Sequence, residues 1–250
     1  ANPSRAANIE GYVQGVHETT LRDLAIADGE ADRTTLPVNV VSRFRYNPTF
    51  ESFYAMVPSI PAILLLLIPA ILMTVSIVNE KELGSIMNFY VTPTSRLEFL
   101  LGKQLPYIAI GLANFVLLTL MSIYLFGVPL KGSGWMLAAC AIAYVATTTG
   151  IGLVISSFTS SQVAAVFVTT VVTILPSLQF SGLMQPVSTL EGSARAIGTC
   201  WPTTYFMHTS VGAFTKGLDA STLAPDLWAL LAFLPVLTIL AVLALRKQER

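Results

Sequence analysis

Charged side chains are rare along most of this chain, but a mixed group of them gathers between Asn79 and Lys103. The group comprises three acids and three bases: Glu80, Lys81, Glu82, Arg96, Glu98 and Lys103. Long uncharged stretches flank this segment on both sides. Such a mixture suits ion pairs with a charged surface on a partner. We call residues 79–103 the elbow and treat it as a candidate contact surface.

The elbow has the pattern of an amphipathic helix. Four apolar side chains recur at the i, i+3, i+4, i+7 spacing of one helical face: Leu83, Ile86, Met87 and Tyr90. This spacing predicts a short helix where membrane meets water. Pro93 ends it, and Ser95 with Glu98 gives a capping-box signal for the next helix. The elbow is then either a docking surface or an ordinary solvated loop between spans.

The composition places the chain among membrane proteins. Apolar residues make up 54% and charged residues 11% of the 250 residues, and the mean hydropathy is +0.68. A soluble globular domain carries about 25% charged residues. The formal net charge is zero, so nothing indicates a nucleic-acid partner.

Uncharged stretches long enough to cross a bilayer predict an all-α, polytopic helical bundle. The five expected spans are about 54–79, 104–128, 135–155, 163–180 and 224–245. The uncharged run from Gly132 to Leu190 is too long for one crossing, and it is divided at Ser156–Gln162, where turn-forming residues gather. Residues 54–250 form the transmembrane domain, in which residues 181–223 are expected to be an external re-entrant segment.

Residues 1–53 are expected to be the C-terminal part of a small α+β extracytoplasmic domain. An amphipathic helix to about Ala27 precedes a strand with period two from Val38 to Tyr46. The elbow and the C-terminal tail carry six Lys and Arg residues, against three in the short opposite connections. The positive-inside rule therefore places the elbow and tail in the cytoplasm. Residues 1–53 then lie outside the cytoplasm. Because they begin with no signal-peptide pattern, a sixth span is expected upstream of Ala1 to carry them across the membrane.

The spans offer little chemistry of their own. We expect no ionisable side chain within them, which leaves no means of coupling to a proton gradient. Hydroxyls that could bind sodium are instead expected to bond the carbonyls of their own helices; they are Thr147, Thr148, Thr149, Ser156, Thr169, Thr170 and Thr173. The histidines His17 and His208 are expected to be surface side chains, and no metal site is expected. The P-loop pattern GxxxxGK[ST] does not occur, so the chain is not expected to be an enzyme.

One motif in the elbow resembles a known family. Glu80-x-Glu82-x-Gly84-Ser85, then Thr92-Pro93, Glu98 and Gly102-Lys103, resembles the signature of the ABC-2 type transporter permeases, the membrane half of ATP-driven exporters. The segments Phe126–Leu130, Ser181–Gly182 with Pro186, and Pro202–Phe206 also look like this family. More loosely, the chain is similar to the permease part of the ribosome-associated ATPase polypeptide.

The resemblance implies six spans per subunit in a bacterial inner membrane and a coupling helix in the elbow. It implies that ATP and magnesium bind a separate ABC ATPase domain or subunit, with no cofactor in this chain, and that a second permease subunit and membrane lipid are partners. Glu80, Glu82 and Gly84 would then shape the docked elbow, whose other contact residues would be Lys81, Leu83, Ser85, Ile86, Met87, Tyr90, Pro93, Arg96 and Glu98. Two alternatives are a membrane anchor that holds a cytoplasmic ATPase without transport and a gradient-driven carrier.

Overall fold

The computed structural model describes residues 11–13, 15–17, 19–20, 23–24, 56–85 and 95–244. The chain divides into two units, residues 1–55 and 56–250. In the first unit the described residues between 11 and 24 are helical, as expected. The strand predicted over Val38–Tyr46 lies outside the described residues.

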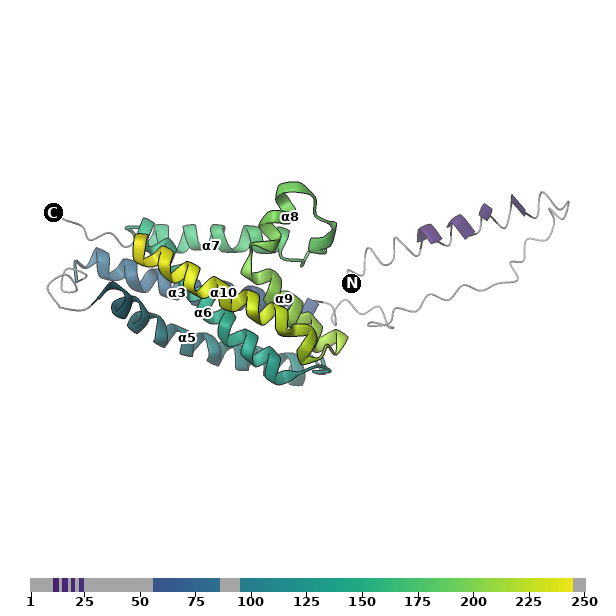
Figure 1. The fold of residues 1–250 in the computed structure, drawn as a ribbon, viewed down its shortest axis with the longest axis horizontal. Coiled ribbons are helices and arrows are strands. Elements are labelled where there is room, and N and C mark those ends of the chain that lie inside the picture. The colour runs from purple at the N-terminus through teal and green to yellow at the C-terminus, as the bar shows by residue number, and fades with distance from the viewer. Residues whose placement is uncertain are drawn as a thin grey trace. The chain divides into compact units, whose positions relative to one another are not determined.

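Within the part of the second unit that the structure describes, five helices are long and apolar enough to cross a membrane, which confirms the predicted number of spans. They are α3 (Ile60–Glu82), α5 (Arg96–Leu120), α6 (Gly134–Phe158), α7 (Gln162–Phe180) and α10 (Ala220–Ala244) (Figure 1). The 3₁₀ turn η1 (Val57–Ser59) leads into α3, and the π-helical turn η2 (Met121–Leu125) extends α5. Between α7 and α10 lie η3 (Val187–Thr189), α8 (Gly192–Thr199), α9 (Pro202–Val211) and η4 (Gly212–Lys216).

The five successive spans run in alternating directions, and α8 and α9 lie between α7 and α10 at one end of the bundle (Figure 1). We call the end where α3 ends, α5 begins and α6 turns into α7 the elbow end. The opposite end, which carries α8 and α9, is the far end. The turn between α6 and α7 falls within the predicted Ser156–Gln162 segment.

Helix α6 forms the centre of the bundle. It is apolar on all sides, and 72% of its most apolar window is buried, against 11% for α10, which is the more apolar of the two. A helix that is apolar all round is buried in protein or faces lipid. Helix α6 is buried in protein, and α10 is positioned to face lipid. Near the elbow end, side chains of four helices form a shared core: Met73, Ile77, Leu100, Leu153 and Ala241.

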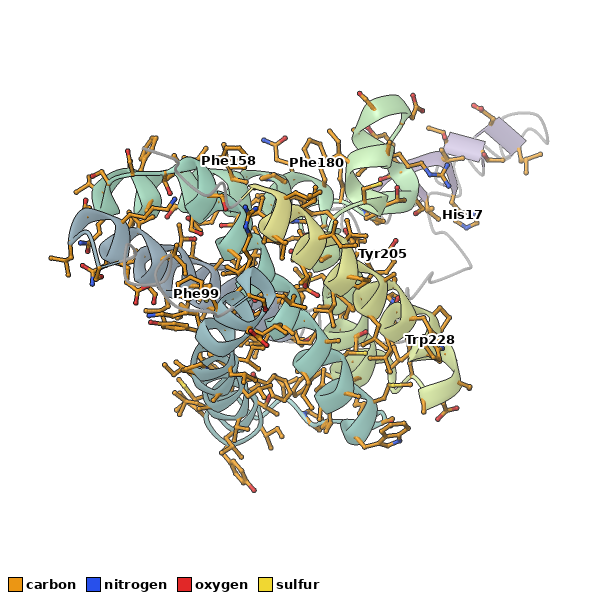
Figure 2. The ribbon with its side chains drawn as sticks, turned by 60° about the vertical axis from the view of Figure 1, so that its left-hand side comes forward. His17, Phe99, Phe158, Phe180, Tyr205 and Trp228 are labelled. Atoms are coloured by element: carbon orange, nitrogen blue, oxygen red, sulfur yellow. The ribbon has the colours of Figure 1, made fainter. Side chains whose placement is uncertain are left out.

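Aromatic side chains mark the far end of the bundle. Tyr124, Trp135 and Trp228 are 81%, 67% and 71% exposed, and they lie near the far ends of α5, α6 and α10 (Trp228 in Figure 2). Tyrosine and tryptophan gather where a membrane meets water, because their rings are apolar and their tips are polar. Their position indicates that this end of the bundle lies at a membrane surface.

Residues 181–223 fold against the bundle through α9. The ring of Phe206 stacks on that of Tyr144 in α6, with centroids 4.4 Å apart. The Tyr144 hydroxyl donates to the carbonyl of Ala62 at 2.7 Å, and it lies within hydrogen-bond distance of the Thr203 hydroxyl, at 3.0 Å. These contacts join α9 to α6 and α3, so this part of the segment is packed within the bundle and is not a free loop.

The buried hydroxyls mostly behave as predicted. Those of Thr147, Thr148, Thr149, Ser156, Thr170 and Thr173 all donate to carbonyls of their own helices. Thr169 is the exception, since its hydroxyl donates to that of Thr74 on α3 at 3.1 Å. The Thr74 hydroxyl in turn lies 2.7 Å from the carbonyl of Ala70 on its own helix and 3.1 Å from that of Gly152 on α6, so its one proton is shared between them. These two bonds link α7, α3 and α6.

Candidate functional site

The end of α3 carries the first half of the elbow motif. The helix continues through Glu82, and Leu83–Ser85 form a turn. The prediction that Leu83 lies on a separate elbow helix is therefore wrong. Gly84 adopts φ +70° and donates its N–H to the carbonyl of Lys81 at 3.2 Å. Glycine reaches this left-handed conformation without steric cost and so ends the helix. Ile86, Met87, Tyr90 and Pro93 lie outside the described residues.

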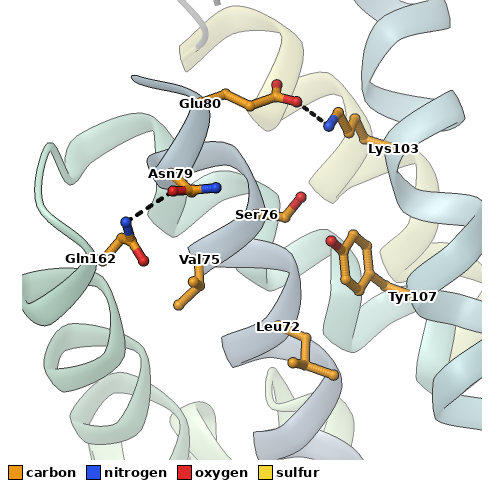
Figure 3. A pocket seen from close by; sticks show the side chains of 8 residues that line it. All are labelled: Leu72, Val75, Ser76, Asn79, Glu80, Lys103, Tyr107 and Gln162. Carbon is orange, nitrogen blue, oxygen red and sulfur yellow. Dashed lines mark hydrogen bonds and ion pairs between the residues drawn. The ribbon is translucent and has the colours of Figure 1, made fainter. Parts of the chain in front are cut away.

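Glu80 connects α3 to α5. Its carboxylate accepts from the ammonium of Lys103 (Figure 3), and the side chains are 24% and 32% exposed. An exposed ion pair contributes about 0–1 kcal/mol. The contact therefore sets the spacing of the two helices more than it stabilises them. Ser85 lies beside this pair in sequence and donates to the backbone carbonyl of Glu80 at 3.3 Å.

Lys81 points towards the end of α6. Its ammonium donates to the carbonyl of Ser156 at 2.5 Å and to that of Thr159 at 3.3 Å. These carbonyls belong to the last turn and C-cap of α6, where the helix dipole is negative. A cation at this position satisfies carbonyls that have no partner within the helix. Lys81 is thus a C-terminal cap supplied from 75 residues away.

Glu82 binds the beginning of α7. Its carboxylate accepts from the backbone N–H of Gln162 at 2.8 Å and from the side-chain amide of the same residue at 2.5 Å. Helix α7 has no side-chain cap from Ser161 and no acidic residue in its first turn. Glu82 therefore supplies the negative charge that a helix N-terminus favours. Asn79 adds a further contact, accepting from the Gln162 side chain at 3.0 Å (Figure 3).

Three consecutive charged residues thus contact three different helices. Successive residues of an α-helix point about 100° apart, so Glu80, Lys81 and Glu82 reach α5, α6 and α7 in turn. Lys81 and Glu82 were predicted to contact an external partner, and these internal partners were not predicted. The alternation of acid, base and acid indicates that these side chains have partners of different charge. It does not indicate which residues those partners are.

The second half of the motif begins α5 as predicted. The Ser95 side chain accepts from the Glu98 N–H at 3.3 Å, and the Glu98 carboxylate accepts from the Ser95 N–H at 2.8 Å. This is the complete capping box. Arg96 forms no ion pair among the described residues and is partly exposed. Leu97 and Leu101 are each 44% exposed on the same first turns. Arg96 and these leucines are therefore accessible to a partner at the elbow end.

The expectation that no ionisable side chain lies within a span is wrong at Asp226. This residue is in the second turn of α10, and only 8% of it is exposed. Its carboxylate lies 2.7 Å from Nδ1 of His208 and accepts from the Thr209 hydroxyl at 3.3 Å. His208 was predicted to be a surface side chain; it is half-exposed but holds this partner. The pair fastens α9 to α10.

The charge of Asp226 also acts on Tyr205 of α9. Partial burial, with smaller contributions from the charges of Cys200 and Asp226, raises the pKa of the Tyr205 hydroxyl. That hydroxyl stays protonated and donates to the carbonyl of Thr199 at 2.7 Å. The hydrogen bonds from His208 and Thr209 offset the burial of the Asp226 carboxylate. Because both partners belong to α9, Asp226 holds that helix in position.

We expect Asp226→Ala to destabilise the protein by about 1–3 kcal/mol, because Thr209 and His208 lose a buried acceptor. The measurement is the melting temperature of the detergent-solubilised protein. Glu191→Ala is the control, since Glu191 is an exposed carboxylate that gives α8 no side-chain cap. Equal melting temperatures for the two variants would show that the Asp226 pair does not hold α9.

The comparisons with known proteins agree on one family. A family model described as ABC-2 family transporter protein matches residues 1–243. The "Probable multidrug ABC transporter permease YbhS" of Escherichia coli (strain K12) is 29% identical over 217 residues, which are 87% of this chain and 57% of that protein. The "Probable multidrug ABC transporter permease YbhR" of the same strain is 23% identical over 230 residues, 92% of this chain and 61% of that protein. The chain thus spans about three fifths of these curated relatives. No solved structure matches it significantly.

Proposed function

The chain belongs to the ABC-2 family of transporter proteins, and from this premise we propose that it is the transmembrane permease of an ATP-driven exporter. ATP and magnesium bind a separate nucleotide-binding domain, which docks on the elbow. A second permease subunit, either a copy or a paralogue, completes the path. The chain itself hydrolyses no nucleotide.

The observation that carries this proposal is the set of contacts made by Glu80, Lys81 and Glu82. A partner that displaces the elbow moves the end of α3, because the elbow follows α3 directly. The same three side chains hold α5, the end of α6 and the beginning of α7. One docking event at the elbow therefore acts on four spans at once, as a coupling device requires.

The orientation follows from charge. The elbow and the C-terminal tail lie in the cytoplasm of a bacterium with the bundle in the inner membrane, and residues 1–53 are extracytoplasmic. The relatives' names include the word multidrug. Amphiphilic organic compounds are therefore the first cargo to test.

The test is transport of a fluorescent amphiphilic cation by the full-length permease and its ATPase in sealed vesicles. We expect movement of the dye with ATP and none with a non-hydrolysable analogue. ATPase binding without dye movement would favour the membrane anchor, which the elbow fits equally well. Movement that persists without ATP but follows an ion gradient would favour a carrier.

A further inference from the structure

A polar hollow of about 330 Å³ lies beside the elbow between α3, α5 and α7. Figure 3 shows its polar lining, which comes from three helices: Ser76, Asn79 and Glu80 of α3, Lys103 and Tyr107 of α5, and Gln162 of α7. Leu72 and Val75 of α3 form the apolar side. The hollow therefore combines charged and apolar walls at one end of the bundle.

The apolar wall continues away from the elbow along α3. Leu72, Ile68 and Ile60 are 36%, 37% and 44% exposed and recur on one face of the helix at multiples of four residues. This face is apolar until Ser76 and Asn79, where it becomes polar. An exposed face that is apolar along its length and polar at the membrane boundary matches an amphiphile with its head at the elbow end.

The polar end has unused hydrogen-bonding capacity. An ammonium group donates three hydrogen bonds and a carboxylate accepts several, but the Lys103–Glu80 contact uses one of each. The hydroxyls of Ser76 and Tyr107 form no hydrogen bond among the described residues. The hollow thus offers donors for a phosphate and an acceptor for an ammonium side by side.

We propose that this hollow binds the head of a zwitterionic phospholipid, with an acyl chain along Leu72 and Ile68. The phosphate accepts from Lys103 and from the Tyr107 hydroxyl, and the lipid ammonium donates to Glu80. The ammonium of Lys103 matches the phosphate of the head, and the carboxylate of Glu80 matches its ammonium. An anionic lipid has no cationic group to pair with Glu80. The proposal does not depend on whether the chain transports a substrate.

The test is native mass spectrometry of the full-length permease purified with equal amounts of phosphatidylethanolamine and phosphatidylglycerol. We expect retained phosphatidylethanolamine to exceed phosphatidylglycerol. Lys103→Gln and Glu80→Gln should each lower its retention about ten-fold, because each removes a charge-assisted hydrogen bond. Lys216→Gln, at an exposed lysine of the far end, is the matched control. Equal retention of the two lipids by wild type would overturn the proposal.

A second variant separates lipid binding from packing of α3 on α5. Leu72→Trp fills the apolar side of the hollow without touching the Glu80–Lys103 pair, and it should expel the lipid at unchanged melting temperature. Retained lipid in this variant would overturn the proposal. Rapid disulfide formation between two copies of Leu72→Cys, in a Cys200→Ser background, would also overturn it, since a second subunit would then cover this face.

Discussion

Reversing the charge at position 81 or 82 is expected to uncouple transport from ATP hydrolysis. Lys81→Glu places a carboxylate against the terminal carbonyls of α6, and Glu82→Lys places an ammonium against the first N–H groups of α7. Each change turns a favourable contact with a helix terminus into a repulsive one. A favourable contact of this kind is worth about 0.3–2 kcal/mol, and about 1.4 kcal/mol corresponds to ten-fold in an equilibrium.

The measurement is dye transported per ATP hydrolysed in sealed vesicles. We expect this ratio to fall about ten-fold or more in either variant, while the ATPase still binds to the permease. Wild-type ratios in both variants would show that the caps on α6 and α7 do not carry the coupling.

A pair of double variants provides the control. Glu80 and Lys103 are each other's partner, so Glu80→Lys with Lys103→Glu should restore what either single change loses. Lys81→Glu with Glu82→Lys should not restore coupling. The C-terminus of α6 stays negative and the N-terminus of α7 stays positive, so each new side chain still meets a terminus of its own charge. Rescue of both double variants would mean that positions 81 and 82 act through each other and not through α6 and α7.

The positions of the spans could be predicted because their signals are local. An uncharged stretch of sufficient length and a turn-rich break at Ser156–Gln162 locate helices without any knowledge of their neighbours. The capping box of Ser95 and Glu98 is local for the same reason, since its partners are three residues apart. The family resemblance rested on equally local motifs.

The interior of the site could not be predicted, because its partners are distant in sequence. Lys81 and Ser156 are separated by 75 residues, and Glu82 and Gln162 by 80. No periodicity or composition relates such positions. Asp226 differs from Lys81 and Glu82, because the sequence alone already places this acidic residue within the span predicted at 224–245. Its partner His208, 18 residues away on α9, is what the sequence does not reveal.

Helices α3 and α6 approach closely at Gly152, and we expect Gly152→Leu to cost about 3 kcal/mol of stability. A Cβ at this position would lie 2.5 Å from the backbone carbonyl oxygen of Ala70 and 3.0 Å from the Met73 side chain. The first obstacle is backbone and cannot rotate away, so α3 would have to move. The Thr74 bond to the Gly152 carbonyl would be lost with it.

The measurement is the melting temperature and the monodisperse yield of the permease in detergent. Gly102→Leu is the matched control, because Gly102 is an exposed glycine in α5 with no atom within 4 Å of a Cβ. Leucine is favoured over glycine in a helix by up to about 1 kcal/mol, so this variant should be as stable as wild type or slightly more so. An unchanged melting temperature in Gly152→Leu would show that the two central helices can separate. The end of α3 would then not be held firmly enough against α6 and α7 to pass on a displacement of the elbow.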